Sequence, residues 1–96
     1  MNPKPEKKVS VRFYSTFKDA LGAREARVSP GSVASALAEL KEKFGAVFSS
    51  ALFPNGRMND RYIILLKGRR LFEKDLGATR LEGGDVLDIF PPVAGG

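Results

Sequence analysis

The chain has 96 residues, of which 43% are apolar and 28% are charged, and its formal net charge is +5. It contains neither Cys nor His, which excludes disulfide bonds, thiol nucleophiles, imidazole bases and nearly every kind of zinc site. The length predicts one domain with a modest core, and no run approaches the roughly 18 apolar residues that a membrane span requires.

The net positive charge raises nucleic acid as a partner, because clustered Lys and Arg neutralise phosphates. Here the basic residues are scattered, and the two densest groups, 4–8 and 67–70, lack the interleaved aromatic residues of a base-stacking surface. An acidic protein partner explains the same charge equally well. We therefore expect neither nucleic acid nor a membrane as the main partner.

The first eight residues, MNPKPEKK, contain two prolines and four charged residues. This composition predicts a disordered leader over residues 1–8. No apolar stretch follows the basic residues as it does in a secretory signal, so we expect a cytoplasmic protein. The folded domain is expected over residues 9–90, followed by a flexible tail over residues 91–96.

The first half of the domain predicts two strands and a helix. Residues 9–15 alternate between apolar and polar side chains, which is typical of a half-buried strand. A second strand is expected at 24–28, joined to the first by turn residues at 18–22. Ser32 is a suitable N-cap for a helix that starts at Val33, and Gly45 is placed as a left-handed residue after its last turn. The core face of this helix comprises Val33, Leu37, Leu40 and Phe44.

The second half predicts shorter elements. Residues 46–60 hold Pro54, Asn55 and Gly56 and indicate an irregular loop, with a helical turn around Phe48–Leu52. The apolar run Tyr62–Leu66 favours a central strand covered on both faces, and Gly68 turns the chain toward a short strand at 70–72. A short helical turn is expected at 75–81.

The last predicted strand covers Asp85–Phe90, after a tight bend at Gly83-Gly84. Leu87 and Ile89 point into the core, so Val86, Asp88 and Phe90 lie on the opposite face. We expect this strand beside the first one, at the centre of the sheet. The fold class is therefore α+β, a mixed sheet of four to five strands with one main helix packed across it.

The order of elements, the Gly83-Gly84-Asp85 bend and the ending "FPPVAGG" at residues 90–96 together resemble a known family. The chain resembles the ubiquitin-like β-grasp sulfur carriers of the MoaD/ThiS type, and most of all the small subunit of molybdopterin synthase. The resemblance extends from Val9 to Gly96. It implies a carrier that is itself non-catalytic and binds no cofactor or metal.

In that family the reactive group is the terminal glycine carboxylate. The resemblance implies that Gly96, preceded by Gly95, is adenylated by an adenylyltransferase similar to ubiquitin-activating enzymes, which uses ATP. A sulfur donor then converts the adenylate to a thiocarboxylate. The loaded tail enters the large subunit of molybdopterin synthase and gives its sulfur to a pterin precursor of the molybdenum or tungsten cofactor.

The tail suits this role, because six residues reach about 20 Å at roughly 3.3 Å each and Pro91-Pro92 favours a stiff, extended conformation. Glycine has no Cβ and passes narrow channels. The outward phase of Phe90 and Tyr14 and the resemblance together indicate an apolar docking surface on the sheet. The residues expected to bind partners are Tyr14, Leu71, Phe90, Pro91, Pro92, Val93 and Ala94.

Two other functions remain open at this point. In one, the same activated tail is joined to lysines as a protein modifier, or its sulfur goes to thiamine or to tRNA. In the other, the chain is a binding module whose tail is inert. The acceptor is recognised by partner enzymes, so the sequence of the carrier does not decide between them.

Overall fold

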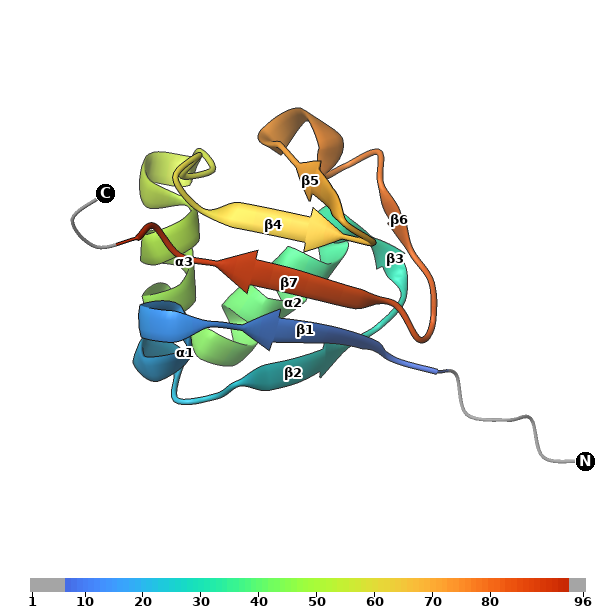
Figure 1. Cartoon of the computed structure of the whole chain (residues 1–96), viewed down its shortest axis with the longest axis horizontal. Coiled ribbons are helices and arrows are strands. Elements are labelled where there is room, and N and C mark those ends of the chain that lie inside the picture. The colour runs from blue at the N-terminus through green and yellow to red at the C-terminus, as the bar shows by residue number, and fades with distance from the viewer. Residues whose placement is uncertain (1–6, 94–96) are drawn as a thin grey trace, which may run out of the picture.

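The computed structural model describes residues 7–93, and Figure 1 shows a sheet with helices packed behind it and at one end. In this part of the chain the main sheet has the strand order β2-β1-β7-β4-β5. Strands β1 and β7 are parallel, and the other neighbouring pairs are antiparallel. These strands are β1 (Val9–Phe13), β2 (Glu25–Val28), β4 (Ile63–Leu66), β5 (Arg69–Leu71) and β7 (Val86–Phe90).

The central place of β7 beside β1 confirms the prediction for the last strand. Residues Leu87 and Ile89 are fully buried, and they pair with Val11 and Phe13 of β1. A parallel pair needs a long connection between its strands. Here that connection comprises all the elements between β1 and β7. The C-terminal segment therefore leaves the fold from the middle of the sheet.

Helix α2 (Val33–Phe44) is the main helix, and its predicted cap is confirmed. The Ser32 Oγ accepts a hydrogen bond from the backbone N–H of Ser35 at 3.0 Å, which satisfies one of the free donors of the first turn. Gly45 has φ +69° and ψ −146°, a conformation reserved for glycine. Its positive φ agrees with the prediction, but its ψ is not that of the left-handed helix.

Two further helices lie where the sequence predicted loops. Helix α1 (Ser15–Leu21) occupies the connection between β1 and β2 and buries Phe17 in the core. Helix α3 (Ala46–Leu52) follows Gly45 directly and extends the helical turn expected at Phe48–Leu52. Within residues 7–93, none of the helices combines the length and apolar character that crossing a bilayer demands.

The helical turn predicted at 75–81 starts two residues earlier and ends before residue 80. A single helical turn is found earlier, at Glu73–Asp75. After four further residues the chain forms β6 (Arg80–Leu81), which pairs with β3 (Gly31–Ser32) in a separate two-stranded sheet. Leu81 is 2% exposed, so this small sheet extends the core beyond the N-terminal end of α2.

The boundary of the predicted leader is wrong for its last two residues. The backbone carbonyl of Lys8 accepts a hydrogen bond from the N–H of Gly84 at 3.0 Å. Lys7 lies so close to the bend that a Cβ added to Gly83 would stand 2.6 Å from its carbonyl oxygen. Residues 7 and 8 therefore belong to the domain, and Gly83 allows this close approach because it has no side chain.

Candidate functional site

The outward face of β7 carries the side chains closest to the start of the tail. Along this strand, Val86, Asp88 and Phe90 are half-buried while Leu87 and Ile89 are fully buried. This alternation follows from the two-residue period of a strand. It confirms that Phe90 is on the face opposite the core, as the sequence predicted.

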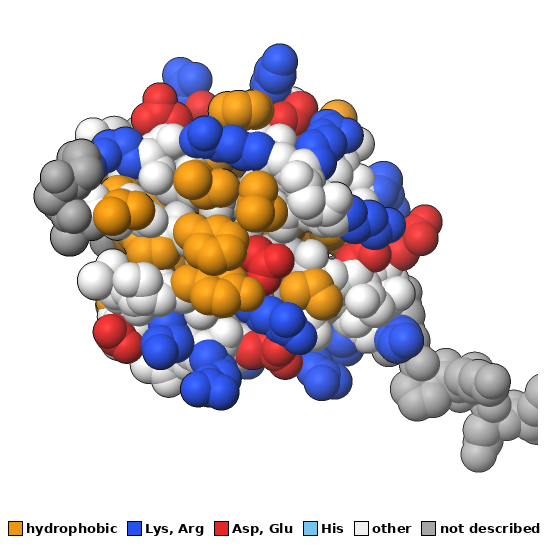
Figure 2. Space-filling view, in the orientation of Figure 1, with side chains coloured by type: hydrophobic (Ala, Val, Ile, Leu, Met, Phe, Trp, Pro, Cys, Tyr) orange, Lys and Arg blue, Asp and Glu red, His pale blue; other side chains and the backbone are white. Residues whose placement is uncertain are grey.

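The neighbouring strands continue this face with apolar residues. Ile63 of β4 lies opposite Phe90, and Leu65 lies opposite Asp88; both are half-buried. Together they form a surface that we call the outer sheet patch, which consists of Tyr14, Ile63, Leu65, Val86 and Phe90 around Asp88. Figure 2 shows apolar side chains gathered at the middle of this face, with Lys and Arg side chains around them.

Tyr14, the residue that follows β1, also belongs to the patch. Its ring stacks on Phe90, with the ring centroids 4.3 Å apart and the planes 13° from parallel. Its hydroxyl donates a hydrogen bond of 2.7 Å to Oδ1 of Asp88. That hydrogen bond, and to a lesser extent burial, raises the pKa of Tyr14 above its ordinary value. The two contacts hold the Tyr14 and Phe90 rings in one orientation.

Leu71 was expected among the partner-binding residues of the sheet surface, and this prediction is wrong. Its side chain is fully buried, and it pairs with Ile64, another core residue, across β4 and β5. The outward residue of β5 is Arg70, whose guanidinium lies 4.8 Å from the ring centre of Phe72. Phe72 is 44% exposed and follows the strand directly, at the border of the sheet.

Ile63 and Leu65 are members of the patch that the sequence analysis missed. The run Tyr62–Leu66 was interpreted as a strand covered on both faces, but the structure leaves one face of β4 partly exposed. The sequence did carry a signal, which is the continuous apolar run itself. A strand with one solvated face normally alternates apolar and polar residues. A continuous apolar run in such a strand indicates a surface that another molecule covers.

The tail begins at the edge of the outer sheet patch. Pro91 is buried, Pro92 is half-buried, and Val93 is 78% exposed. The first residue of the tail that was predicted to be flexible over 91–96 therefore packs on the fold. The remaining predicted site residues, Ala94, Gly95 and Gly96, lie outside the described residues.

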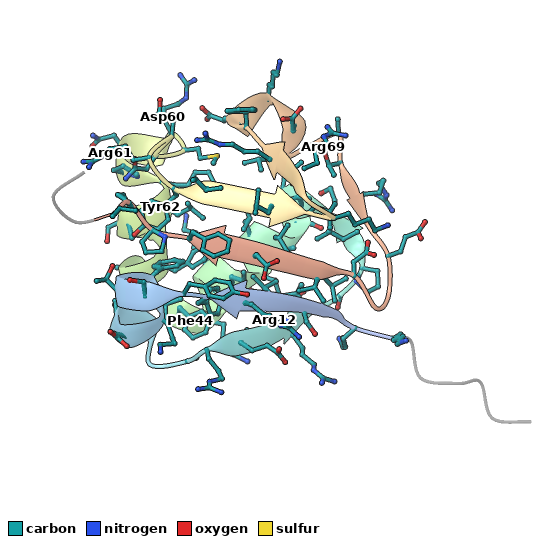
Figure 3. All side chains as sticks on the ribbon, viewed as in Figure 1. Arg12, Phe44, Asp60, Arg61, Tyr62 and Arg69 are labelled. Atoms are coloured by element: carbon teal, nitrogen blue, oxygen red, sulfur yellow. The ribbon has the colours of Figure 1, made fainter. Side chains whose placement is uncertain are left out.

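Basic side chains border the patch on several sides. Figure 3 shows Arg12 toward the β1–β2 side of the face, and Arg61 and Arg69 toward opposite ends of the β4–β5 side. Arg12 forms an ion pair with Glu25 at 3.4 Å, and its side chain is 52% exposed. Exposed ion pairs of this kind contribute little to stability, so these charges remain available to a partner.

The described part of the chain shows no arrangement typical of a metal site. Among residues 7–93, no three acidic side chains lie close enough together to hold a metal ion. The patch itself consists of apolar and aromatic groups with one carboxylate. Chemically, such a surface is suited to binding a protein.

Comparisons with known proteins place the chain in a family. The model of the ThiS family matches residues 11–96. Small archaeal modifier protein 3 from Haloferax volcanii is 31% identical over 91 residues, which cover 92% of this chain and 98% of that protein.

Two solved structures show the same fold over nearly their whole length. SAMP1 from Haloferax volcanii has a TM-score of 0.78 at 27% identity, covering 93% of this chain and 99% of that one. The putative molybdopterin converting factor subunit 1 from Pyrococcus furiosus has a TM-score of 0.69 at 26% identity, covering 91% and 99%. These matches confirm the ubiquitin-like β-grasp fold and the resemblance to carriers of the MoaD/ThiS type. The chain belongs to the ThiS family.

Proposed function

We propose that the chain is a sulfur carrier, the small subunit of molybdopterin synthase, whose reactive group is the carboxylate of Gly96. The observation that carries the proposal is the path of the tail. It leaves the central strand β7 beside the outer sheet patch, and the ThiS family match continues through residue 96. A partner that binds the patch therefore receives the tail at the same time.

The chemistry starts from a carboxylate, which is a poor acceptor for nucleophiles because its negative charge repels them. The adenylyltransferase joins it to the α-phosphate of ATP and releases pyrophosphate, which gives an acyl-adenylate. Hydrosulfide then displaces AMP, loses its proton and leaves a C-terminal thiocarboxylate. The carrier provides no catalytic side chain for these steps, which agrees with a chain that contains neither Cys nor His.

The tail has enough length to deliver this group to a buried active site. Pro91 is buried, so the reach of the tail is counted from residue 92, and five fully extended residues span about 16 Å at roughly 3.3 Å each. Pro92 limits the conformations of the first free residue, and the loss of entropy on insertion is smaller for a restricted segment. The docking surface then sets where the segment enters the partner.

Two partners use the same surface in this proposal. The adenylyltransferase binds the carrier first, and the large subunit of molybdopterin synthase binds the loaded carrier afterwards. Phe90, Tyr14 and the apolar side chains of β4 form the contact, while the tail occupies the active site of each partner. On the large subunit the thiocarboxylate sulfur attacks the pterin precursor, and water then cleaves the C–S bond to the Gly96 carbonyl carbon, which leaves the sulfur on the pterin and restores the carboxylate.

The experiment that tests this function is a stepwise reconstitution. The carrier, the adenylyltransferase, ATP and sulfide are incubated together, and the intact carrier is weighed by mass spectrometry. Replacement of one oxygen by sulfur adds about 16 Da. The loaded carrier is then mixed with the large subunit and the pterin precursor, and formation of molybdopterin is the expected result. A carrier that loads but gives no molybdopterin with its large subunit contradicts the pterin role.

A second candidate is a protein modifier. The specific observation in its favour is that both Haloferax volcanii proteins described above are named as small archaeal modifier proteins, whereas the name of the Pyrococcus furiosus protein favours the pterin role. A modifier transfers the activated carbonyl carbon of Gly96 to a lysine amine, and AMP leaves. Mass spectrometry of proteins isolated from the native cell tests this, because an isopeptide adduct carries the C-terminal residues of this chain on a lysine.

A further inference from the structure

Asp88 stands out among the side chains of the outer sheet patch because it carries the patch's negative charge. It is half-buried on the central strand β7, with Leu65 of β4 on one side and Arg12 of β1 on the other. Its Oδ1 accepts the hydrogen bond from Tyr14 at 2.7 Å. A carboxylate therefore occupies the middle of an otherwise apolar contact surface.

Asp88 has no ion-pair partner in the described part of the chain, although Arg12 lies beside it on β1. Arg12 directs its Nε toward Glu25 at 3.4 Å, and within residues 7–93 no Lys or Arg nitrogen forms an ion pair with Asp88 at 4.0 Å or less. Tyr14 is neutral and supplies one hydrogen bond, while an ionised carboxylate has about four acceptor positions. In the free carrier this carboxylate is half-buried, so water can reach the other positions.

A partner that covers the patch removes this water. An ionised carboxylate buried without a countercharge is strongly unfavourable, whereas one paired with a cation and hydrogen-bonded is tolerated. A wholly apolar partner surface would match Tyr14, Ile63, Leu65 and Phe90 but would leave Asp88 unpaired. The covering surface must therefore contain a cationic donor at this position.

We infer that the protein partner presents a Lys or Arg side chain to Asp88 from within an apolar contact surface. Tyr14 holds the carboxylate toward that position through its hydroxyl, and the stacked Tyr14 and Phe90 rings lie beside it. A guanidinium fits this place well, because it donates two parallel hydrogen bonds to a carboxylate and also packs on aromatic faces. Asp88 thus selects partners by charge, while the apolar residues supply contact area.

The inference rests on the proposed function, since it names the chemistry of the partner that this function requires. Its test uses the full-length carrier and the adenylyltransferase of the same cell, with dissociation constants measured by calorimetry. Asp88→Asn keeps the shape of the side chain and removes the charge. The matched control is Asp60→Asn, the same substitution at an exposed carboxylate outside the patch.

We expect Asp88→Asn to weaken binding at least about tenfold, because removing one member of a buried charge pair leaves the other uncompensated. Asp60→Asn should change the affinity less than about twofold. Asp88→Leu distinguishes a cationic partner surface from an apolar one. If the partner presents a cation, Asp88→Leu should bind more weakly than Asp88→Asn. If the partner surface is apolar, Asp88→Leu should bind as tightly as wild type or more tightly. Equal or tighter binding of Asp88→Leu overturns the inference.

A double-mutant cycle then identifies the cation. Each Lys and Arg of the adenylyltransferase surface that contacts the carrier is replaced by Gln. One of these replacements should weaken binding of the wild-type carrier and have little effect with Asp88→Asn. If every replacement has the same effect with both carriers, no cation faces Asp88 and the inference is wrong.

Failure of this inference is distinguishable from failure of the proposed function. ATP–pyrophosphate exchange with the wild-type carrier reports the function, whereas the affinity ratio of Asp88→Asn to wild type reports the inference. If wild type supports exchange and Asp88→Asn binds with unchanged affinity, only the inference is rejected. If wild type supports no exchange, both the proposed function and the inference are rejected. Circular dichroism of both Asp88 variants checks the fold, and Asp88→Asn provides the test even if Asp88→Leu unfolds.

Discussion

Tyr14 and Phe90 stack nearly parallel across β1 and β7, with their ring centroids 4.3 Å apart. Phe90 is the last residue of its strand and precedes Pro91 by one peptide bond. A surface that covers these two rings therefore binds at the point where the tail begins. In the proposed function, docking and delivery of the tail therefore depend on the same residues.

The first prediction concerns Phe90. Phe90→Ala should weaken binding to the adenylyltransferase and to the synthase large subunit by about 2 kcal/mol, which is roughly thirtyfold, because aromatic residues at interfaces are often this important. The fold should remain, since Phe90 lies on the outward face. Calorimetry measures the dissociation constants, and values equal to those of wild type would remove Phe90 from the docking surface.

Leu87→Ala is the contrasting control on the same strand. Leu87 is fully buried, so its truncation should lower the free energy of unfolding by about 2–5 kcal/mol. Urea denaturation measures this change. The pair of variants separates loss of contact with a partner from loss of the fold.

The second prediction concerns the bend that receives Lys7. Gly83→Ala should destabilise the domain by about 1 kcal/mol, because the new Cβ would stand 2.6 Å from the carbonyl oxygen of Lys7 and would displace the segment that precedes β1. Gly77→Ala is the matched control, since a Cβ there meets nothing within 4 Å. Thermal melting compares the two, and equal melting temperatures would show that Lys7 is not held at the bend.

The third prediction concerns the N-terminal segment. Removing residues 1–6 should leave the melting temperature unchanged, because their prolines and charges offer little to bury. Removing residues 1–8 also takes away the carbonyl of Lys8 that accepts the N–H of Gly84. That deletion should cost about 1 kcal/mol. Equal stability of the two truncated chains would count against a domain boundary before Lys7.

The fourth prediction concerns the dependence of stability on pH. Burial raises the pKa of Tyr62 above the ordinary value of 10.0, so the unfolded chain loses this proton at a lower pH than the folded chain does. The stabilisation is complete below pH 10 or so, and it is lost as the pH rises through the folded pKa. Tyr62→Phe should therefore show a smaller fall in unfolding free energy as the pH rises above about 10. Parallel curves for both proteins would exclude this contribution.

The parts of the fold that sequence predicts well depend on local signals. The alternation in β1 and β7 and the cap at Ser32 are set by neighbouring residues, and all three are found as expected. Helix α1 has no comparable signal. It starts at Ser15 with φ +55° and without a side-chain cap, and it is held by the packing of Phe17 on distant aromatic rings such as Tyr62.

The candidate site shows a second limit, which is strand register. The short strand was predicted at 70–72 and is found at Arg69–Leu71, and its pairing with β4 turns Leu71 into the core. Neighbouring residues of a strand point to opposite faces, so a correct strand does not by itself assign a side chain to a face. Phe90 was assigned correctly because β7 carries a clear alternation that excludes the other phase.

The central claim, that the carboxylate of Gly96 is the reactive group, has a direct geometric consequence. Catalysis requires the reacting atom to be placed within about 1 Å, whereas deletion of one residue withdraws the carboxylate by about 3.3 Å. Neither deletion of Gly96 nor addition of one residue after it touches the outer sheet patch. Both variants should therefore fold and still dock.

The measurement is ATP–pyrophosphate exchange by the cognate adenylyltransferase, with circular dichroism to verify the fold of each carrier. The wild-type chain should support exchange, and the chain that lacks Gly96 and the chain with one added residue should support none. Exchange at the wild-type rate by the chain that lacks Gly96 would contradict the claim that this carboxylate is activated.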